Sequence, residues 1–292
     1  MYVIQQVIQG VAMGSVYGLI AIGYVLIWNT WGVLNFAQGE VVMIGAFSIL
    51  ILRVWLGLPW LIAFPGALVM CMLIGYIIEV LAFRPLIRAK DTSRLIATLG
   101  VGICLRNLYR VIFGADPYAF PSIFGANPVH LGGVTIVPEN IWNMVIGFGL
   151  VGLLSLFLKK TNLGKAMRAT AQNRDAARLM GINVKRCMSL TFVIASGLGG
   201  FAGMLVAPLY FVMASMGQTM GTKGYASAVF GGISSTGGSM VGGMTLGLLE
   251  SLGAGYISSA YQSAIAFLIM FLVIIFKPSG LMVQDKNYSR KV

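Results

Sequence analysis

Long apolar runs, separated by short polar or glycine-rich breaks, cover most of this chain. Seven of these runs have about the 20 apolar residues that a helix needs to cross the hydrocarbon core of a bilayer. All five tryptophans fall at the ends of runs, where an aromatic belt would place them. The pattern therefore predicts an all-α polytopic membrane protein with about seven clear transmembrane helices. We expect these helices at residues 5–28, 33–52, 58–83, 95–113, 140–158, 187–212 and 259–276.

A stretch rich in small residues, from Gly221 to Ile257, lies between the sixth run and the last. Its Gly, Ser and Thr residues cluster at Gly231–Ser239, which indicates a break in the helix. Irregular backbone inside a membrane is tolerated only where protein or a water-filled cavity covers it, and it often marks a transport path. We expect an inward-dipping pair of short helices here, which gives 8–9 helical segments in all. The alternative is two ordinary helices that pack tightly through small residues.

Composition and charge support a membrane protein and suggest its orientation. Residues of the hydrophobic types make up 58% of the chain and charged residues only 10%, against roughly 25% charged in average soluble domains. The net charge is +12, but 16 of the 20 Lys and Arg residues lie in three regions, 84–94, 159–186 and the tail from residue 277. This clustering fits the positive-inside rule better than nucleic-acid binding. We therefore expect these three regions to be cytoplasmic, and the N-terminus and residues 114–139 to lie outside.

The loop Lys159–Arg186 holds eight of the basic residues and a short helix with its own start and stop signals. Asn173 can cap the helix start, Asp175 places a negative charge in the first turn, and Gly181 can end it in the left-handed conformation. Seven or eight residues form only a marginal helix in water. We expect this helix to persist because a partner docks against it. The alternative is a charged loop that only anchors the topology.

Polar residues begin the second apolar run. Asn35, Gln38 and Glu40 are spaced so that at least two of them share a helix face. A carboxylate such as Glu40 is costly within an apolar run unless it is functional or paired. The alternative is an interfacial polar start to a helix.

The remaining charges and potential metal ligands suggest no catalytic site. Glu79 is expected to form an ion pair with Arg84 at the membrane interface, and Arg110, four residues after Arg106, to extend outward. One His, three scattered Cys and no clustered carboxylates argue against metal binding and nucleophilic catalysis. The phosphate-binding pattern GxxxxGK[ST] is absent from the sequence. If ATP drives this protein, the ATP site lies on another chain.

Four motifs in order carry a resemblance to a known family. They are WGVLNFAQGEVVMIGAF (Trp31–Phe47), TNLGKAMRATAQNRDAARLMGINVKR (Thr161–Arg186), FGGISSTGGSMVGGMTLGLLESL (Phe230–Leu252) and KPSGLM (Lys277–Met282). On these motifs the chain resembles the permease subunits of branched-chain amino-acid ABC importers, the leucine/isoleucine/valine type, in its shorter H-type form. Asp175-Ala176-Ala177, followed by Gly181, also resembles the EAA-type coupling motif of ABC permeases. The chain departs from the family at Gln38, where the family commonly has His.

The resemblance implies a single permease domain over residues 1–292 in a bacterial inner membrane, with its C-terminus cytoplasmic. It implies four kinds of partner: a second permease in a heterodimer, two ATPase subunits that hold the ATP and Mg, an extracytoplasmic binding protein and membrane lipid. No cofactor, metal, catalytic residue or nucleic acid is implied for this chain. The residues expected to couple to the ATPase are Asp175, Ala176, Ala177 and Gly181, and those expected along the translocation path are Asn35, Gln38, Glu40, Ser234, Ser235 and Thr236.

Branched-chain amino acids are the substrate that the resemblance implies, with two alternatives. Relatives with similar permeases import urea or short amides. A different class would be a stand-alone secondary transporter, in which Glu40 and Glu250 would be ion-coupling groups.

Overall fold

The computed structural model describes residues 2–87, 89–123, 125, 129–131, 134–277 and 280–282. Arg88, and the tail residues Lys286, Arg290 and Lys291 on which part of the expected orientation depends, lie outside the described residues. The chain divides into two compact units, and the helices α1, α5 and α9 each have one part in either unit. The single permease domain expected from the sequence stays a prediction. One unit holds Leu26–Phe120 and Gly149–Gly221, and the other Met1–Val25, Pro121–Phe148 and Thr222–Val292.

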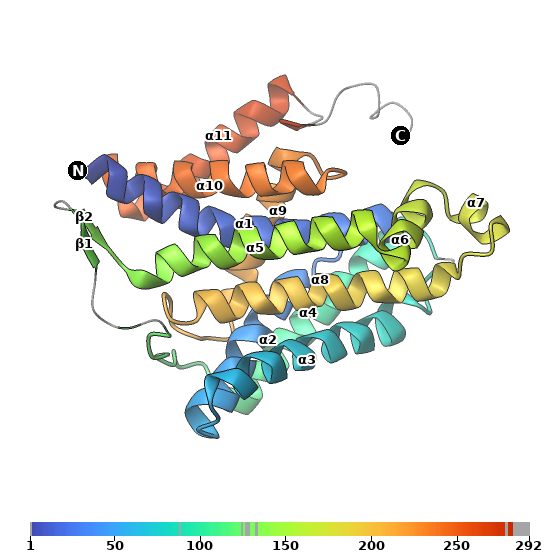
Figure 1. Cartoon of the computed structure of the whole chain (residues 1–292), viewed down its shortest axis with the longest axis horizontal. Helices are drawn as coiled ribbons and strands as arrows, with labels where there is room; N and C mark the ends of the chain where they lie inside the picture. The colour runs from blue at the N-terminus through green and yellow to red at the C-terminus, as the bar shows by residue number, and fades with distance from the viewer. Residues whose placement is uncertain are drawn as a thin grey trace. The chain divides into compact units, whose positions relative to one another are not determined.

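The unit built on Leu26–Phe120 and Gly149–Gly221 contains most of the long helices (Figure 1). Two of its helices, α2 and α3, continue into the short π-helices η1 and η2. Its elements are the end of α1 (Tyr2–Trp31), α2 (Gln38–Leu50), η1 (Ile51–Trp55), α3 (Trp60–Ile78), η2 (Glu79–Phe83), α4 (Asp91–Phe113), most of α5 (Pro138–Lys160), α6 (Asn162–Gln172), α7 (Arg174–Leu179), α8 (Val184–Val206) and the start of α9 (Met216–Gly231).

Helix α2 is the centre of this unit, because every one of its residues is buried. It packs against α8 through glycines. A Cβ added at Gly203 would overlap with the carbonyl oxygen of Val42, and one added at Gly45 would overlap with the backbone of Gly200. Helices in a membrane gain little hydrophobic stabilisation from each other, so small residues that bring backbones together supply van der Waals contact instead. The abundance of glycine in the sequence is thus used for close helix packing.

The second unit is organised around the pair of helices α1 and α10, which run side by side (Figure 1). Gly10, Gly14 and Gly18 recur every fourth residue on α1, and they face the α10 backbone around Gly243 and Gly247. The other elements are two antiparallel strands, β1 (Val129–Leu131) and β2 (Val134–Ile136), the start of α5, the end of α9, α10 (Thr236–Tyr256), the 3₁₀-helix η3 (Ser259–Tyr261) and α11 (Gln262–Phe276).

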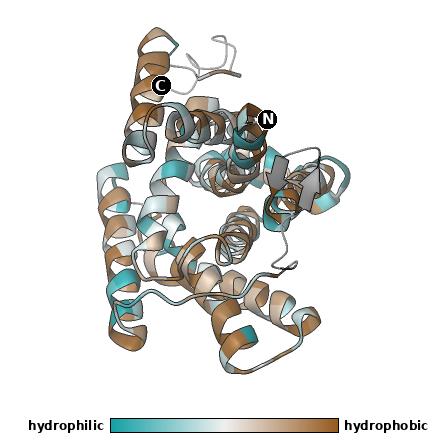
Figure 2. Ribbon diagram, turned by 90° about the vertical axis from the view of Figure 1, so that its left-hand side faces the viewer, coloured by the Kyte–Doolittle hydropathy of each residue, from teal (hydrophilic) through white to brown (hydrophobic). Residues whose placement is uncertain are grey.

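The helices confirm the fold class predicted from the apolar runs. Among the described residues, six helices are long and apolar enough to cross a membrane, and α11 is a shorter apolar helix. Apolar residues, brown in Figure 2, dominate the ribbon, and few residues of α4 and α5 are buried inside the protein although both helices are largely apolar. Such helices fit contact with lipid or with another membrane protein.

Several boundaries differ from the expectation; for example, α8 ends at Val206 instead of residue 212. The second run becomes helical at Gln38 instead of residue 33, because the Asn35 side chain accepts a hydrogen bond from the Ala37 N–H and holds a turn. The glycine-rich region also contains longer helices than expected. Its break spans only the residues between Gly231 and Thr236, where Gly232 has φ +105°. That the two helices dip into the membrane stays a prediction.

Candidate functional site

The short helix α7 is closed at both ends, as its sequence predicts. The Asn173 side chain accepts hydrogen bonds from the N–H groups of Asp175 and Ala176, both at 3.0 Å. At the other end Gly181 has φ +79°, and two backbone bonds turn the chain back: Gly181 N–H to Arg178 O at 3.1 Å, and Ile182 N–H to Ala177 O at 3.0 Å. This is the Schellman arrangement, which satisfies carbonyls at a helix end. A helix of six residues is thereby held in one conformation.

The side chains of α7 divide into an inward and an outward set. Ala177, one of the residues expected to couple to the ATPase, is only 4% exposed, because the chain itself covers it. Its coupling role stays a prediction. Leu179 and Met180 are 89% and 82% exposed, although both are apolar. Exposed apolar side chains on a rigid projecting segment are typical of a protein interaction site. Sequence reasoning missed these two residues, although their position just before the predicted stop at Gly181 is a usable signal.

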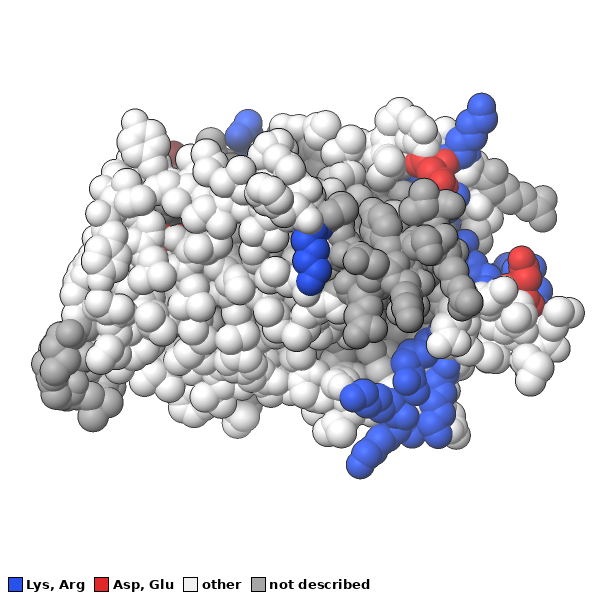
Figure 3. All heavy atoms as spheres, turned by 90° about the horizontal axis from the view of Figure 1, so that it is seen from above, with Lys and Arg blue, Asp and Glu red and all other residues white. Residues whose placement is uncertain are grey.

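The helix α6, which precedes α7, was not predicted. Thr161 caps it by accepting a hydrogen bond from the Gly164 N–H at 3.0 Å, and Met167 and Thr170 face inward. A Cβ at Gly164 would overlap with the carbonyl oxygen of Phe157, so α6 turns back closely onto the end of α5. The α6–α7 pair is therefore anchored to a membrane helix. On the face drawn in Figure 3, Lys and Arg side chains (blue) gather mainly toward the end that carries α6 and α7 in Figure 1.

Arg174, the first residue of α7, connects this segment to the turn that leads into α2. Its guanidinium lies next to Gly32, where an added Cβ would be 3.4 Å from Nη2. Burial, followed by the charge of nearby Arg94, lowers the pKa of the Arg174 guanidinium from its ordinary value. Arg94 in turn donates a hydrogen bond to the carbonyl oxygen of Trp31 at 3.2 Å. The start of α7 and the turn before α2 are thus held in direct contact.

Glu40, at the start of α2, is buried and paired, which accounts for a carboxylate in an apolar run. Arg106 of α4 binds it through Nε at 3.0 Å and also through Nη2. Arg106 Nη1 donates to the side chain of Gln218 in α9 at 2.7 Å. A Cβ at Gly217 would lie 2.5 Å from Glu40 Oε2, so a glycine at this position gives the carboxylate space. This ion pair joins α2, α4 and α9.

The other polar residues expected along the path do not share one face with Glu40. Gln38 points toward α8, where its Nε2 donates to the Ala195 carbonyl at 2.8 Å, while its buried Oε1 has no hydrogen-bond partner in the described part of the chain. Asn35 precedes the helix in the turn and is buried. The three residues therefore serve three different contacts.

Ser234 and Ser235 lie in the break before α10, and Thr236 is the first residue of α10, in the other unit. The Ser235 side chain caps α10 by accepting a hydrogen bond from the Gly238 N–H at 3.0 Å. The expected roles of these residues in a translocation path stay predictions.

A second buried ion pair lies in the unit that holds α10. Lys223 of α9 and Glu250 of α10 are each 5% exposed, and Lys223 Nζ donates to Glu250 Oε2 at 3.0 Å. Tyr17 of α1 donates to the same carboxylate oxygen at 2.9 Å, and Ser263 of α11 donates to Oε1 at 3.1 Å. One carboxylate thus ties four helices together. Sequence reasoning identified Glu250 but not its partner, because Lys223 lies 27 residues away on a different helix.

The chemistry of these groups is that of binding and positioning. Within the described ranges, no three His, Cys, Asp or Glu side chains lie close enough to hold a metal ion. The expected ion pair of Glu79 and Arg84 is present, with Nη2 and Oε2 2.9 Å apart, and the Glu79 side chain is buried.

Replacing Arg106 with Met is expected to destabilise the protein strongly, because it leaves the buried Glu40 carboxylate without its cation. Removing one partner of a buried pair costs about 3–5 kcal/mol. We expect a loss of stability near the lower end of this range, because the Arg106 side chain is partly exposed. The thermal unfolding temperature of the detergent-solubilised protein measures this. Arg110→Met is the matched control: Arg110 lies on the same helix, is exposed, and forms no ion pair within the described ranges. Equal shifts for the two variants would contradict the assignment.

The sequence of this chain is similar to that of known proteins. A family model described as "Branched-chain amino acid transport system / permease component" matches residues 6–274. The chain is 35% identical to the high-affinity branched-chain amino acid transport system permease protein LivH of Escherichia coli (strain K12), over 97% of this chain and 96% of that protein. It is also 35% identical to the permease protein BraD of Pseudomonas aeruginosa, over 96% of this chain and 95% of that protein.

The chain is also similar in fold to a solved structure, PsaBC from Streptococcus pneumoniae in complex with Fab, with a TM-score of 0.50 and 16% identity, and the match covers 97% of this chain and 93% of that one. At this identity the likeness concerns the fold alone.

Proposed function

Since this chain belongs to the family of permease components of branched-chain amino acid transport systems, we propose that it forms one half of the membrane pathway through which an ABC importer moves branched-chain amino acids. The observation that carries the coupling role is α7, which is capped at both ends and exposes Leu179 and Met180. A rigid projecting helix with an apolar tip suits docking into a groove of an ATPase subunit. ATP and Mg would be bound by two such subunits.

The route for coupling runs from α7 to the transmembrane helices. Force applied at Leu179 and Met180 would reach α8, which begins five residues after α7 ends, and the Gly32 turn through Arg174. That turn leads directly into α2, which packs against α8 over its buried face. Closure of the ATPase dimer would thereby tilt α2 and α8 together. A second permease would supply the other half of the path, and alternating access would result from motion between the two.

The remaining parts of the proposal concern orientation and substrate delivery. The basic regions at 84–94 and 159–186 would face the cytoplasm of a bacterial cell with the permease in its inner membrane, and the N-terminus would lie outside. An extracytoplasmic binding protein would deliver the amino acid and set most of the specificity. Helix N-termini such as that of α10, where Ser235 already caps the first turn, carry partial positive charge that suits a substrate carboxylate.

Uptake of leucine into vesicles that contain the reconstituted importer is expected to require ATP on the side of the ATPase subunits. It should continue when an ionophore collapses the proton gradient, because a docked ATPase and not an ion drives the cycle. Urea serves as the comparison substrate and should not compete. Leucine uptake driven by an ion gradient in the absence of ATP would instead support a secondary transporter.

A further inference from the structure

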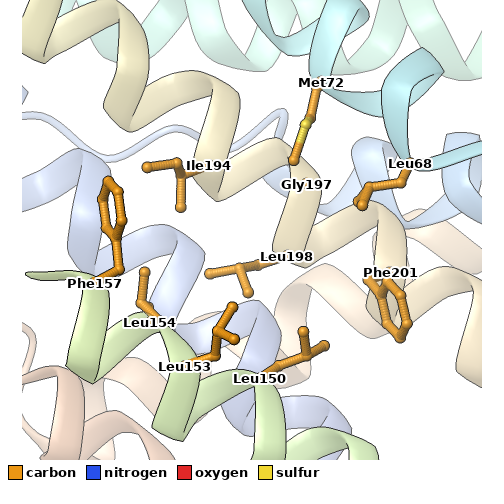
Figure 4. A pocket seen from close by; sticks show the side chains of 10 residues that line it. All are labelled: Leu68, Met72, Leu150, Leu153, Leu154, Phe157, Ile194, Gly197, Leu198 and Phe201. Atoms are coloured by element: carbon orange, nitrogen blue, oxygen red, sulfur yellow. The ribbon is translucent and has the colours of Figure 1, made fainter. Parts of the chain in front are cut away.

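An apolar groove lies between α3, α5 and α8, within the unit that contains α2 (Figure 4). Its volume is about 280 Å³, and its lining is almost entirely apolar. In Figure 4, Phe157 and Ile194 lie on one side of the groove, Leu68 and Phe201 on the other, and Met72 lies next to Gly197. All three helices are long and apolar enough to cross a membrane. The groove therefore opens where hydrocarbon, and not water, is the surrounding solvent.

Gly197 keeps the groove open on the α8 side. A Cβ at this position would lie 2.8 Å from Cε of Met72, and any larger side chain would project into the space that the groove occupies. The neighbouring α5 residues Leu150, Leu153, Leu154 and Phe157 recur at the spacing of a single helix face. The groove is thus bordered by one continuous stripe of α5.

Basic residues stand at the same end of all three helices. Arg84, just beyond η2, donates a hydrogen bond to the Ser189 hydroxyl in the first turns of α8 at 3.1 Å, which places the end of α3 beside the start of α8. Lys159 and Lys160 lie in the last turn of α5, which ends on the same side as the start of α8. Leu150 lies ten residues before Lys160, which corresponds to about 15 Å along a helix. This is half of the roughly 30 Å hydrocarbon core, the depth of one lipid leaflet.

Only one of the two lysines lies on the groove side of α5. Lys160 is three residues after Phe157 and shares its face, whereas Lys159 is two residues after it and points to the opposite side. Both are exposed, and neither forms an ion pair within the part of the chain that the structure describes. A free cation at the membrane end of an apolar groove is complementary to a phosphate.

We propose that this groove is a binding site for an anionic phospholipid. One acyl chain fills the space between α3, α5 and α8, and the phosphate pairs with Lys160. The apolar lining accepts a hydrocarbon chain, the depth matches one leaflet, and the charge at the end of α5 selects an anionic headgroup. This site depends on the helices spanning a membrane and does not depend on the transported substrate.

Native mass spectrometry tests the site on the full-length permease, purified in detergent and incubated with equal amounts of phosphatidylglycerol and phosphatidylcholine. The wild type is expected to retain one phosphatidylglycerol. Gly197→Leu should lose the bound lipid, because leucine fills the groove. Lys160→Gln should keep a lipid but lose about fivefold of the preference for phosphatidylglycerol, as expected for one surface cation.

Two matched variants serve as controls. Gly152→Leu places the same side chain on α5, where an added Cβ meets nothing within 4 Å, and Lys159→Gln removes the charge on the opposite face. Both should bind lipid as the wild type does. The proposal is wrong if the wild type retains no lipid, or if Lys160→Gln and Lys159→Gln show the same preference. Crosslinking of Leu153→Cys to a second permease, without retained lipid, would assign the groove to a protein partner instead. If Gly197→Leu does not fold, the two lysine variants still decide the question.

Discussion

Replacing Glu250 with leucine is expected to lower the free energy of unfolding by about 3–5 kcal/mol, because it leaves the ammonium of Lys223 buried without a counter-charge. Lys223 would retain one weak partner, the hydroxyl of Tyr17 at 3.2 Å. The same substitution also removes the acceptor for Tyr17 and Ser263, which belong to α1 and α11. The loss is therefore among the largest that a single substitution can produce in this chain. Unfolding of the detergent-solubilised permease by heat or denaturant measures it.

The double variant Lys223→Met/Glu250→Leu separates a charge effect from a packing effect. Removing both charges leaves no buried ion, so most of the lost stability should return. If the double variant instead loses as much stability as the single variants Lys223→Met and Glu250→Leu together, the ion pair contributes nothing beyond packing. The exposed pair Asp175–Arg178, at 3.8 Å, is the control, and Arg178→Ala should leave stability unchanged within measurement because water already surrounds both groups.

Gly181→Val is expected to reduce ATP-driven uptake to background while the permease still inserts in the membrane. Residue 181 has φ +79°, which a β-branched side chain strongly resists. Losing this conformation releases the two backbone bonds that end α7 and displaces Leu179 and Met180. Ala177→Arg should have the same result by another route, because it forces a guanidinium into a position that is only 4% exposed. Uptake and copurification of the ATPase subunits are measured together.

Gly114→Val is the matched control for the backbone strain. Gly114 also has positive φ, +84°, with open space around it, but it follows α4 and lies far along the chain from α7. This variant should retain the ATPase subunits. If Gly181→Val also retains them and transports normally, α7 is only part of a charged loop that anchors the topology.

The sequence predicted those elements that depend on interactions between residues close together in the chain. Apolar runs predicted the membrane-capable helices, and Asn173 and Gly181 predicted both ends of α7, since caps act on the few residues around them. The pair of Glu79 and Arg84 was predictable because the two residues are one turn apart.

The contacts that depend on the fold could not be predicted in the same way. Glu40 was recognised as needing a partner, but Arg106 is 66 residues away and was only one of several basic residues that could have filled the role. The inward direction of Ala177 depends on how α7 packs on its own loop, which the spacing of a six-residue helix does not determine. The sequence did not predict that α6 starts at the Thr161 cap, because many basic residues interrupt the apolar pattern of the loop.

The glycines between α1 and α10 restrict how this protein can move. Added Cβ atoms at Gly14, Gly243 and Gly247 would each lie against the opposite backbone, so the two helices are in backbone contact at these positions. Sliding by one residue would bring side chains such as Met244 into positions that only glycine can occupy. A change in the register of α1 and α10 therefore requires the two helices to separate first, so we expect them to move as a pair.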